Sequence, residues 1–326
     1  MRAAEKPASL LPPLTRRFIL VTLAPRLRSL IPLAVIAVVL AAVGIARAAS
    51  SSQFPLKLKA ANGVVTISHR PSRIVSLSAT ATEDLYAVGA GKQVVAVDSY
   101  STYPPQAPRT KLSGFDPNIE AIAKYRPDLV VVSDDTGHVV EQFGKLHIPV
   151  LIEPPATNLN GVYAQIDQLA QATGNPSGAK RVVSGMRAQV SAILRSVPRP
   201  RKPLTVYHEL DQTYYSATSH TFIGQMYTLL GLRNIADKAG GSTAYPQLSA
   251  EYIIASDPDL IVLADTVCCS QSLKTVAARP GWNTINAVKS GAVVAVNDSI
   301  ASEWGPRIVL FLKAVADAVK RLEAHA

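Results

Sequence analysis

Two stretches of the chain share one pattern that decides the fold. The first covers residues 118–134 and reads NIEAIAKYRPDLVVVSD, and the second covers residues 249–265 and reads SAEYIIASDPDLIVLAD. In each copy a glutamate stands seven residues before a Pro-Asp pair, four apolar residues follow, and an aspartate ends the stretch. The copies lie 131 residues apart. A unit of helix, turn and strand repeated at that distance indicates two similar lobes.

Short runs rich in Val and Ile continue this pattern along the chain. Uninterrupted apolar runs are typical of parallel strands that are covered on both faces. We expect strands at Ile74–Leu77, Val94–Val97, Leu129–Val132, Val150–Ile152, Leu204–His208, Leu260–Leu263 and Val293–Val296. Helical patterns fall between them, for example over Thr82–Val88 and Ile119–Tyr125. The alternation predicts an α/β fold with parallel sheets.

A long helix is predicted between the two copies, from Pro176 to Val197. Its apolar residues recur at steps of three and four and form one stripe. About 20 residues span roughly 30 Å, which is enough to cross between two lobes; the alternative is a surface helix of one lobe. The sequence therefore predicts a polar segment (49–70), an N-terminal lobe (71–174), a linking helix (175–198) and a C-terminal lobe (199–326).

The first 48 residues have the composition of an export signal. Arginines precede a stretch from Leu30 to Ile45 that has no charged residue, and Ala46-Arg47-Ala48 follows it as a cleavage pattern. This stretch is shorter than the roughly 20 residues that a membrane-spanning helix needs. We expect a cleaved signal peptide, with an N-terminal membrane anchor as the alternative. The chain is then exported to the periplasm or to the outer face of the cytoplasmic membrane.

The positive charge of the chain belongs largely to this leader. The formal net charge is +10, but residues after 48 carry 26 Lys and Arg against 22 Asp and Glu. No stripe of Lys and Arg with interleaved aromatic residues is present. We therefore predict no nucleic-acid partner and contact with the membrane only through the leader.

The chain has two cysteines, Cys268 and Cys269, which are adjacent. In an oxidising compartment such a pair can form a vicinal disulfide; two free thiols in a loop is the alternative. The six histidines form no pair at metal-ligand spacing, and no phosphate-binding loop or nucleophile elbow follows a strand. We predict that the chain is not an enzyme and that it has no dedicated metal site and no cofactor.

Aromatic side chains gather instead in the segments that follow predicted strands. In open α/β sheets, ligands bind at the carboxyl ends of the strands, and rigid rings suit a large, partly apolar ligand. Each ring on its own is as well explained by packing. The expected ligand contacts are Tyr100, Tyr103, Phe115, His208, Tyr215, Tyr245 and Trp304.

Five further motifs carry a resemblance to a known family. They are residues 73–83 (RIVSLSATATE), 98–106 (DSYSTYPPQ), 245–251 (YPQLSAE), 279–282 (RPGW) and 304–307 (WGPR). Over roughly residues 64–322 the chain resembles the cobalamin and ferric-siderophore binding proteins of ABC importers, the periplasmic substrate-binding proteins with a helical backbone. The resemblance implies two α/β lobes on one long rigid helix and a monomer that binds a ferric siderophore or a corrinoid in a ligand cleft between the lobes. It also implies delivery to permease subunits that work with a cytoplasmic ATPase.

The resemblance also assigns roles to single residues. Glu120 and Glu251, which head the repeated units, match the glutamates that meet arginines of the permease; otherwise they are acids favoured at a helix start. Glu303 stands where a cobalamin binder can have a basic residue, which leaves ferric siderophore, another corrinoid or haem open. The alternative functions are a metal-handling enzyme or chelatase on the same two-lobed scaffold, and a ligand sensor.

Overall fold

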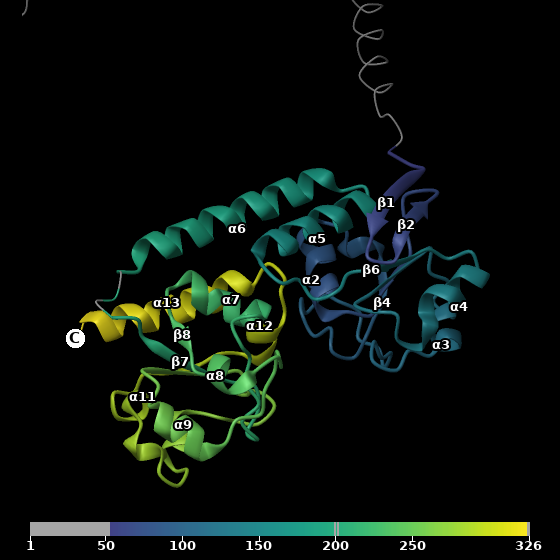
Figure 1. Cartoon of the computed structure of the whole chain (residues 1–326). Helices are drawn as coiled ribbons and strands as arrows, with labels where there is room; N and C mark the ends of the chain where they lie inside the picture. Colours follow the sequence, from purple (N-terminus) through teal and green to yellow (C-terminus); the bar gives the residue numbers. More distant parts are fainter. Residues whose placement is uncertain (1–52, 199, 201, 325–326) are drawn as a thin grey trace, which may run out of the picture. The chain divides into compact units, whose positions relative to one another are not determined.

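The computed structural model describes residues 53–198, 200 and 202–324. Within them lie two four-stranded parallel sheets, one in each half of the chain (Figure 1). The first sheet has the strand order β4-β3-β5-β6 and the second has the order β10-β9-β7-β8. The strands of the first are β3 (Ile74–Ser76), β4 (Val94–Val97), β5 (Leu129–Val132) and β6 (Val150–Ile152); those of the second are β7 (Thr205–Glu209), β8 (Arg233–Asn234), β9 (Leu260–Leu263) and β10 (Val293–Ala295). The predicted α/β fold with two parallel sheets is confirmed.

Helices cover both sheets. In the first half they are α2 (Ala79–Ala87), α3 (Ile119–Ala123), α4 (Val139–Lys145) and α5 (Leu159–Ala172), with 3-10 turns η1 (Gly91–Gln93) and η2 (Thr136–His138). In the second half they are α7 (Phe222–Leu229), α8 (Ala236–Gly240), α9 (Ala250–Ser256), α10 (Leu273–Ala277), α11 (Asn286–Lys289), α12 (Asp298–Ser302) and α13 (Ile308–Ala324), with the 3-10 turn η3 (Trp282–Thr284). Because both faces are covered, every residue of the central strands β3, β5 and β9 is buried.

The Pro-Asp pair of each repeat has a structural task that explains its recurrence. Asp128 accepts hydrogen bonds from the backbone N–H groups of Ser72 and Arg73, just before β3, at 2.8 and 2.9 Å. In the second lobe, Asp259 accepts from the backbone N–H of Thr205, the first residue of β7, at 2.8 Å. Each aspartate therefore fixes the start of the neighbouring strand beside its own strand, and the repeat encodes strand pairing.

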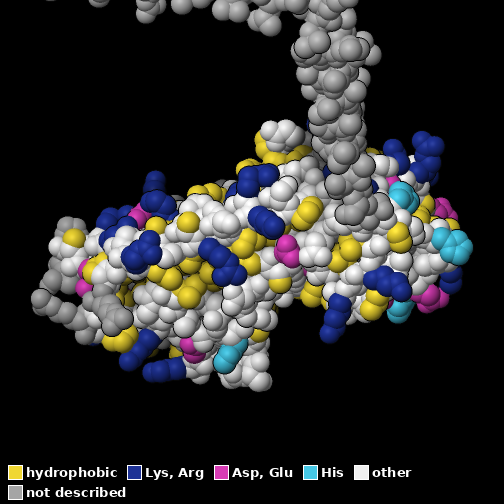
Figure 2. Space-filling model, turned by 90° about the horizontal axis from the view of Figure 1, so that it is seen from above, with side chains coloured by type: hydrophobic (Ala, Val, Ile, Leu, Met, Phe, Trp, Pro, Cys, Tyr) yellow, Lys and Arg dark blue, Asp and Glu magenta, His cyan; other side chains and the backbone are white. Residues whose placement is uncertain are grey.

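The long helix α6 (Pro176–Ser196) follows the first half and leads into the second. Figure 1 shows it running along one side of both sheets, where it packs against α5 of the first lobe and α13 of the second. Met186 and Val190 of the predicted stripe are buried on its inner face. On the face that carries α6, Lys and Arg side chains are spread as separate groups among hydrophobic ones (Figure 2).

Residues 53–70 hold a feature that their polar sequence did not predict. β1 (Leu56–Ala60) and β2 (Gly63–Ile67) form an antiparallel hairpin. Its turn residue Asn62 donates a side-chain hydrogen bond to the backbone oxygen of Val150 in β6, at 2.9 Å. The predicted leader, residues 1–48, lies outside the described residues. Among the helices that the structure describes, none combines the length and the apolar character needed to cross a bilayer.

Candidate ligand site between the lobes

A cavity of about 650 Å³ lies between the two lobes. Its lining comes from the ends of β3, β4, β5 and β6 on one side and from α12 and the residues after it on the other. The residues that line it are Leu77, Ser78, Ala79, Thr80, Asp98, Tyr100, Gly114, Phe115, Ser133, Asp134, Pro155, Asp298, Ser299, Ser302, Glu303 and Trp304. The cavity therefore occupies the place where open α/β sheets bind ligands, at the carboxyl ends of their strands.

Three of the predicted aromatic residues form walls of this cavity. Tyr100 and Phe115 meet edge to face, with ring centroids 5.3 Å apart, and both remain largely exposed to solvent. Trp304 faces them from the other lobe, and its indole N–H donates to the side chain of Gln165 at 3.0 Å. Large aromatic side chains left open to a cavity bind a partly apolar ligand well, because burying them gains hydrophobic free energy at little conformational cost.

Gly114 is the residue that brings Phe115 to the cavity. A Cβ atom at position 114 would lie 2.3 Å from the backbone oxygen of Leu77, well inside van der Waals contact. Only glycine therefore allows the loop to approach the end of β3 so closely. Ser113 then holds the next turn, because its hydroxyl accepts from the backbone N–H groups of Phe115 and Asp116.

Four carboxyl groups line the cavity, and its sixteen lining residues include no Lys, Arg or His. Asp98 is buried, which raises its pKa, although the hydroxyl and backbone N–H of Ser101 donate to it and partly oppose that rise. The pKa of Glu303 is raised to about 7, chiefly by burial and against the opposing effect of Arg307. Asp134 and Asp298 complete the set. The surface offered to a ligand is thus aromatic and acidic.

Next to the cavity, one arginine joins the two lobes. Arg307 bonds to Glu83 of α2 through its side-chain Nε at 2.5 Å and its backbone N–H at 2.7 Å. Its Nη2 donates to Glu303 at 3.0 Å, and its guanidinium lies 3.9 Å from the ring centre of Tyr103. Arg307 is therefore already engaged with two carboxylates and one ring. Tyr103, predicted as a ligand contact, lies at this junction and not among the lining residues.

His208 was predicted as a ligand contact, and the structure corrects this. It lies on the central strand β7 with no exposed surface, against the rings of Tyr227 and Phe311. Its Nδ1 is 2.6 Å from the Tyr227 hydroxyl, and burial lowers its pKa to about 3, so the ring is neutral. The prediction failed because the strand extends to Glu209, one residue beyond the predicted end, which places His208 inside the core.

Two other predicted contacts, Tyr215 and Tyr245, lie in neighbouring loops of the second lobe. Tyr215 pairs with Gln247 in an isolated bridge, and Ser216 donates its backbone N–H to the oxygen of Pro246 at 2.9 Å. Both tyrosines are more than 40% exposed and neither lines the cavity. Their contact with a ligand stays a prediction.

The carboxylates of the cavity were not among the predicted contacts, although the sequence carries a signal for three of them. Asp98 directly follows β4, and Asp134 ends the first repeat two residues after β5. Polar residues at the ends of parallel strands meet at one edge of the sheet. Asp298 stands two residues after the predicted strand Val293–Val296. Glu303 has no such signal, because it lies beyond α12, which was not predicted.

Glu120 and Glu251 are exposed in the first turns of α3 and α9. The caps of these helices match: Asn118 accepts from the backbone N–H of Ala121 at 2.9 Å, and Ser249 accepts from that of Tyr252 at 3.1 Å. Figure 1 shows α3 and α9 both on the side away from α6, one on each lobe. This arrangement leaves the two carboxylates free for a partner; docking stays a prediction.

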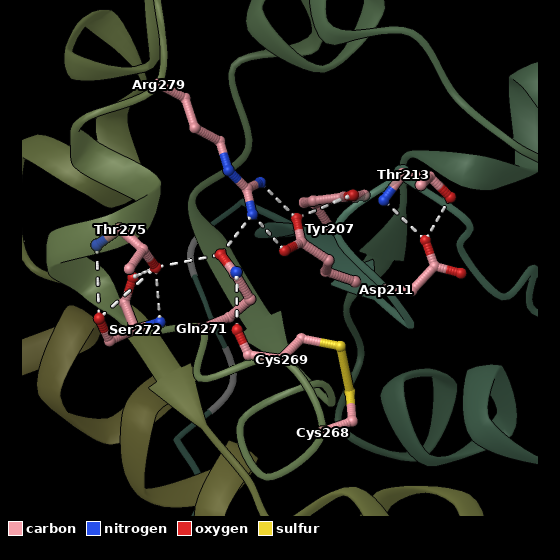
Figure 3. Close-up of polar contacts among 10 residues, drawn as sticks. Tyr207, Asp211, Thr213, Cys268, Cys269, Gln271, Ser272, Thr275 and Arg279 are labelled. Atoms are coloured by element: carbon pink, nitrogen blue, oxygen red, sulfur yellow. Dashed lines mark hydrogen bonds and ion pairs between the residues drawn. A yellow bond between two sulfur atoms is a disulfide. The ribbon is translucent and has the colours of Figure 1, made fainter.

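Cys268 and Cys269 are joined in a vicinal disulfide in the loop that follows β9 (Figure 3). No group of three or more His, Cys, Asp or Glu side chains among the described residues is arranged to hold a metal ion.

The sequence pattern described as "Periplasmic binding protein" matches residues 74–299. The chain belongs to this family. A relative from Halobacterium salinarum, named cobalamin-binding protein, is 34% identical over 272 residues, which cover 79% of this chain and 72% of the relative. The Bacillus subtilis lipoprotein YvrC, an uncharacterized ABC transporter substrate-binding protein, is 29% identical over 82% of this periplasmic binding protein and 86% of its own length.

A solved structure has a similar fold. The apo form of the periplasmic heme-binding protein RhuT from Roseiflexus sp. RS-1 is 26% identical and superposes with a TM-score of 0.68, covering 78% of this chain and 99% of that one. The family resemblance that the sequence predicted is confirmed. One of these similar proteins is thus named for cobalamin and another for haem.

The buried carboxyl groups predict an unusual pH dependence of stability. Burial raises the pKa of Glu153 to about 8, and the pKa values of Asp265 and Glu303 are raised to about 7. Because the folded pKa values exceed the unfolded ones, the native state binds more protons, so stability falls as the pH rises through this range. The lowered pKa of His208 has the opposite effect on stability, but only below about pH 6.5, its pKa in the unfolded chain. His208 therefore does not change the slope of stability with pH above that value.

We therefore expect the melting temperature to fall between about pH 6.5 and 8.5, measured by circular dichroism in buffers of constant ionic strength. Glu153→Gln, which removes the group with the highest of these pKa values, should flatten the profile. A melting temperature that rises across the window, or a variant with an unchanged slope, would contradict this assignment.

Proposed function

We propose that the chain is the extracytoplasmic substrate-binding receptor of an ABC importer, and that its ligand is a corrinoid of the cobalamin type. The observation that carries the choice of ligand is the cavity lined by aromatic rings and four carboxyl groups, with no basic side chain in its lining. The names of the relatives support the class of ligand, and the fold supports capture between two lobes.

The charge of the cavity disfavours the anionic candidate ligands. Haem carries propionates, and ferric catecholate complexes carry net negative charge. Either would bring anions against Asp98, Asp134 and Asp298, and like charges close together in a partly buried site are unfavourable. A corrinoid instead carries a ring of neutral amide side chains, whose N–H groups donate to carboxylates, around a metal centre of positive charge. Carboxylates accept such hydrogen bonds more strongly than neutral groups do.

The partner in this proposal is a permease driven by a cytoplasmic ATPase. Uptake of labelled cyanocobalamin by cells that lack this protein, with and without the restored gene, tests the function. We expect the loss of the gene to remove high-affinity uptake and the restored gene to return it. Unchanged corrinoid uptake together with lost use of haem or of a ferric siderophore would contradict the ligand. Normal uptake with a lost transcriptional response to corrinoid would instead support the sensor.

Replacement of Tyr100 by alanine should weaken cyanocobalamin binding by about 1–3 kcal/mol, the range for a ring that anchors a ligand. Folding should be unaffected, because Tyr100 is 60% exposed and its ring contact is with the equally open Phe115. Isothermal titration calorimetry measures the affinity. Tyr100→Phe, which keeps the ring, is the matched control and should bind like the unaltered chain. If Tyr100→Ala binds equally well, the ring is not a ligand contact; Tyr245→Ala tests the second lobe in the same way.

A further inference from the structure

Residues 266–271, within the loop between β9 and α10, carry the disulfide and two sets of anchoring hydrogen bonds. Cys268 is exposed to solvent and Cys269 is partly buried. Ser270, which follows them, has φ = 54°, a left-handed conformation that is uncommon for serine. The disulfide is therefore open to attack at Cys268 by a thiol in solution.

One side of the loop is bonded to a residue of the ligand cavity. Asp298, which lines the cavity, accepts from the backbone N–H of Val267 at 2.9 Å through Oδ1 and from that of Cys268 at 2.8 Å through Oδ2. The hydroxyl of Thr266 adds a longer bond of 3.3 Å. Asp298 is also the first residue of α12, which supplies Ser299 and Ser302 to the lining. Backbone N–H groups at and next to the disulfide thus hold a carboxylate of the cavity, that of Asp298, in place.

The other side of the loop is bonded to the core of the second lobe. The Gln271 amide donates to the backbone oxygen of Cys269 at 3.1 Å, and its Oε1 accepts from Arg279 at 2.8 Å. Arg279 in turn holds the fully buried Glu209 with two bonds of 2.6 Å. Figure 3 shows this chain of contacts from Arg279 through Gln271 to the two cysteines. Because this anchor is fixed, a change in the backbone of the cysteines is passed to the side that faces Asp298.

We propose that Cys268–Cys269 is a site of thiol–disulfide exchange whose oxidation state sets the ligand affinity of the cavity through Asp298. The proposal rests on the proposed function for its affinity measurement. The reagent is a small dithiol. One thiolate attacks the Cys268 sulfur, the bond between the two cysteines breaks, and Cys269 leaves as a thiolate that takes up a proton. The second thiolate then releases Cys268, so the dithiol becomes a disulfide and the protein gains two electrons and two protons.

The oxidised form should bind ligand more tightly. In this form the disulfide closes a small ring that restricts the peptide bond between the two cysteines. The ring keeps the backbone N–H groups of Val267 and Cys268 both directed at Asp298. Reduction removes this restraint. The Asp298 carboxylate then loses the two N–H groups that hold it, and the shape of the cavity is no longer fixed at this point. We expect affinity to fall about fivefold or more, the lower end of typical coupling between two sites.

The test compares the full chain in two states with cyanocobalamin as the probe. One sample is kept oxidised; the other is reduced with dithiothreitol, alkylated with iodoacetamide and freed of reagent before titration. The variant Cys268→Ala/Cys269→Ala should bind like the alkylated sample whatever its treatment. Val267→Ala keeps its backbone N–H and is the matched control, which should bind like the oxidised chain. In Asp298→Asn the difference between the two states should shrink.

A second measurement needs no ligand. Hydrogen exchange at the amides of Val267 and Cys268 should be faster in the reduced chain than in the oxidised one, because Asp298 no longer holds them. If cyanocobalamin binds neither state, the proposed ligand is wrong, and the exchange rates alone decide the redox link. Equal exchange in both states would overturn the proposal. So would equal affinity of the oxidised, alkylated and double-alanine proteins, or two titratable thiols in the chain purified without reductant.

Discussion

The double substitution Glu120→Ala/Glu251→Ala should abolish uptake of the ligand by cells while leaving ligand affinity and melting temperature almost unchanged. Both carboxylates are exposed at helix starts, one on each lobe, and neither lines the cavity. Two equal charges at matching places suit a transporter with twofold symmetry and complementary positive charge. Such complementarity governs encounter and register more than raw affinity, so its loss removes productive docking.

The matched control removes one acid from each lobe elsewhere. Asp167 lies on α5 and Glu323 lies on α13. Both helices pack against α6, and α6 runs along the side of the lobes that is away from α3 and α9. Asp167→Ala/Glu323→Ala should transport normally at equal expression. Each single substitution, at Glu120 or at Glu251, should give partial uptake. Normal transport by the Glu120/Glu251 double variant would leave both residues as helix-start acids only.

Arg279→Ala should lower the free energy of unfolding by about 3–5 kcal/mol, the usual cost of leaving one member of a buried ion pair alone. Glu209 is 0% exposed and Arg279 12% exposed, and two bonds of 2.6 Å join them. The guanidinium also lies 4.5 Å from the ring centre of Trp282, which stacks on Tyr214. Substitution therefore removes a charge partner and ring contacts, and it leaves the Glu209 carboxylate without its cation inside the core.

Urea unfolding followed by circular dichroism measures this loss. The double variant Arg279→Met/Glu209→Gln should recover part of the stability, because it removes both charges and retains much of the volume. A loss below about 1 kcal/mol for Arg279→Ala would show that the pair behaves like an exposed salt bridge and is not part of the core.

The fold was accessible from the sequence because local patterns specify it. Each of the seven predicted strands overlaps an observed one, since an apolar run between polar turns has one stable place in a covered parallel sheet. β8 was missed because its two residues, Arg233 and Asn234, form no apolar run. The hairpin β1–β2 was missed because only uninterrupted apolar runs were taken as strands, whereas β1 alternates leucine with lysine, the pattern of a half-buried strand.

The site was accessible only in part, because it is assembled by contacts between distant segments. Tyr100 and Trp304 follow predicted strands and Phe115 precedes the first repeat, so their position at the cavity could be predicted. The junction of Arg307 with Glu83 joins residues 224 positions apart, and no local pattern specifies such a pair. His208 shows the opposite error: it was predicted at the end of a strand, next to the cleft, but one further residue of strand placed the ring against Tyr227 in the core.

Equilibrium dialysis of the purified chain against cyanocobalamin, haem and a ferric catecholate tests the central claim most directly. The account predicts one cyanocobalamin bound per chain at micromolar or lower concentration, with much weaker binding of the two anionic ligands. It also predicts that fluorescence quenching on binding is lost in Trp304→Phe and retained in Trp282→Phe, because Trp304 lines the cavity and Trp282 is fully buried elsewhere. Tight binding of haem or of the ferric catecholate, with none of cyanocobalamin, would contradict the account.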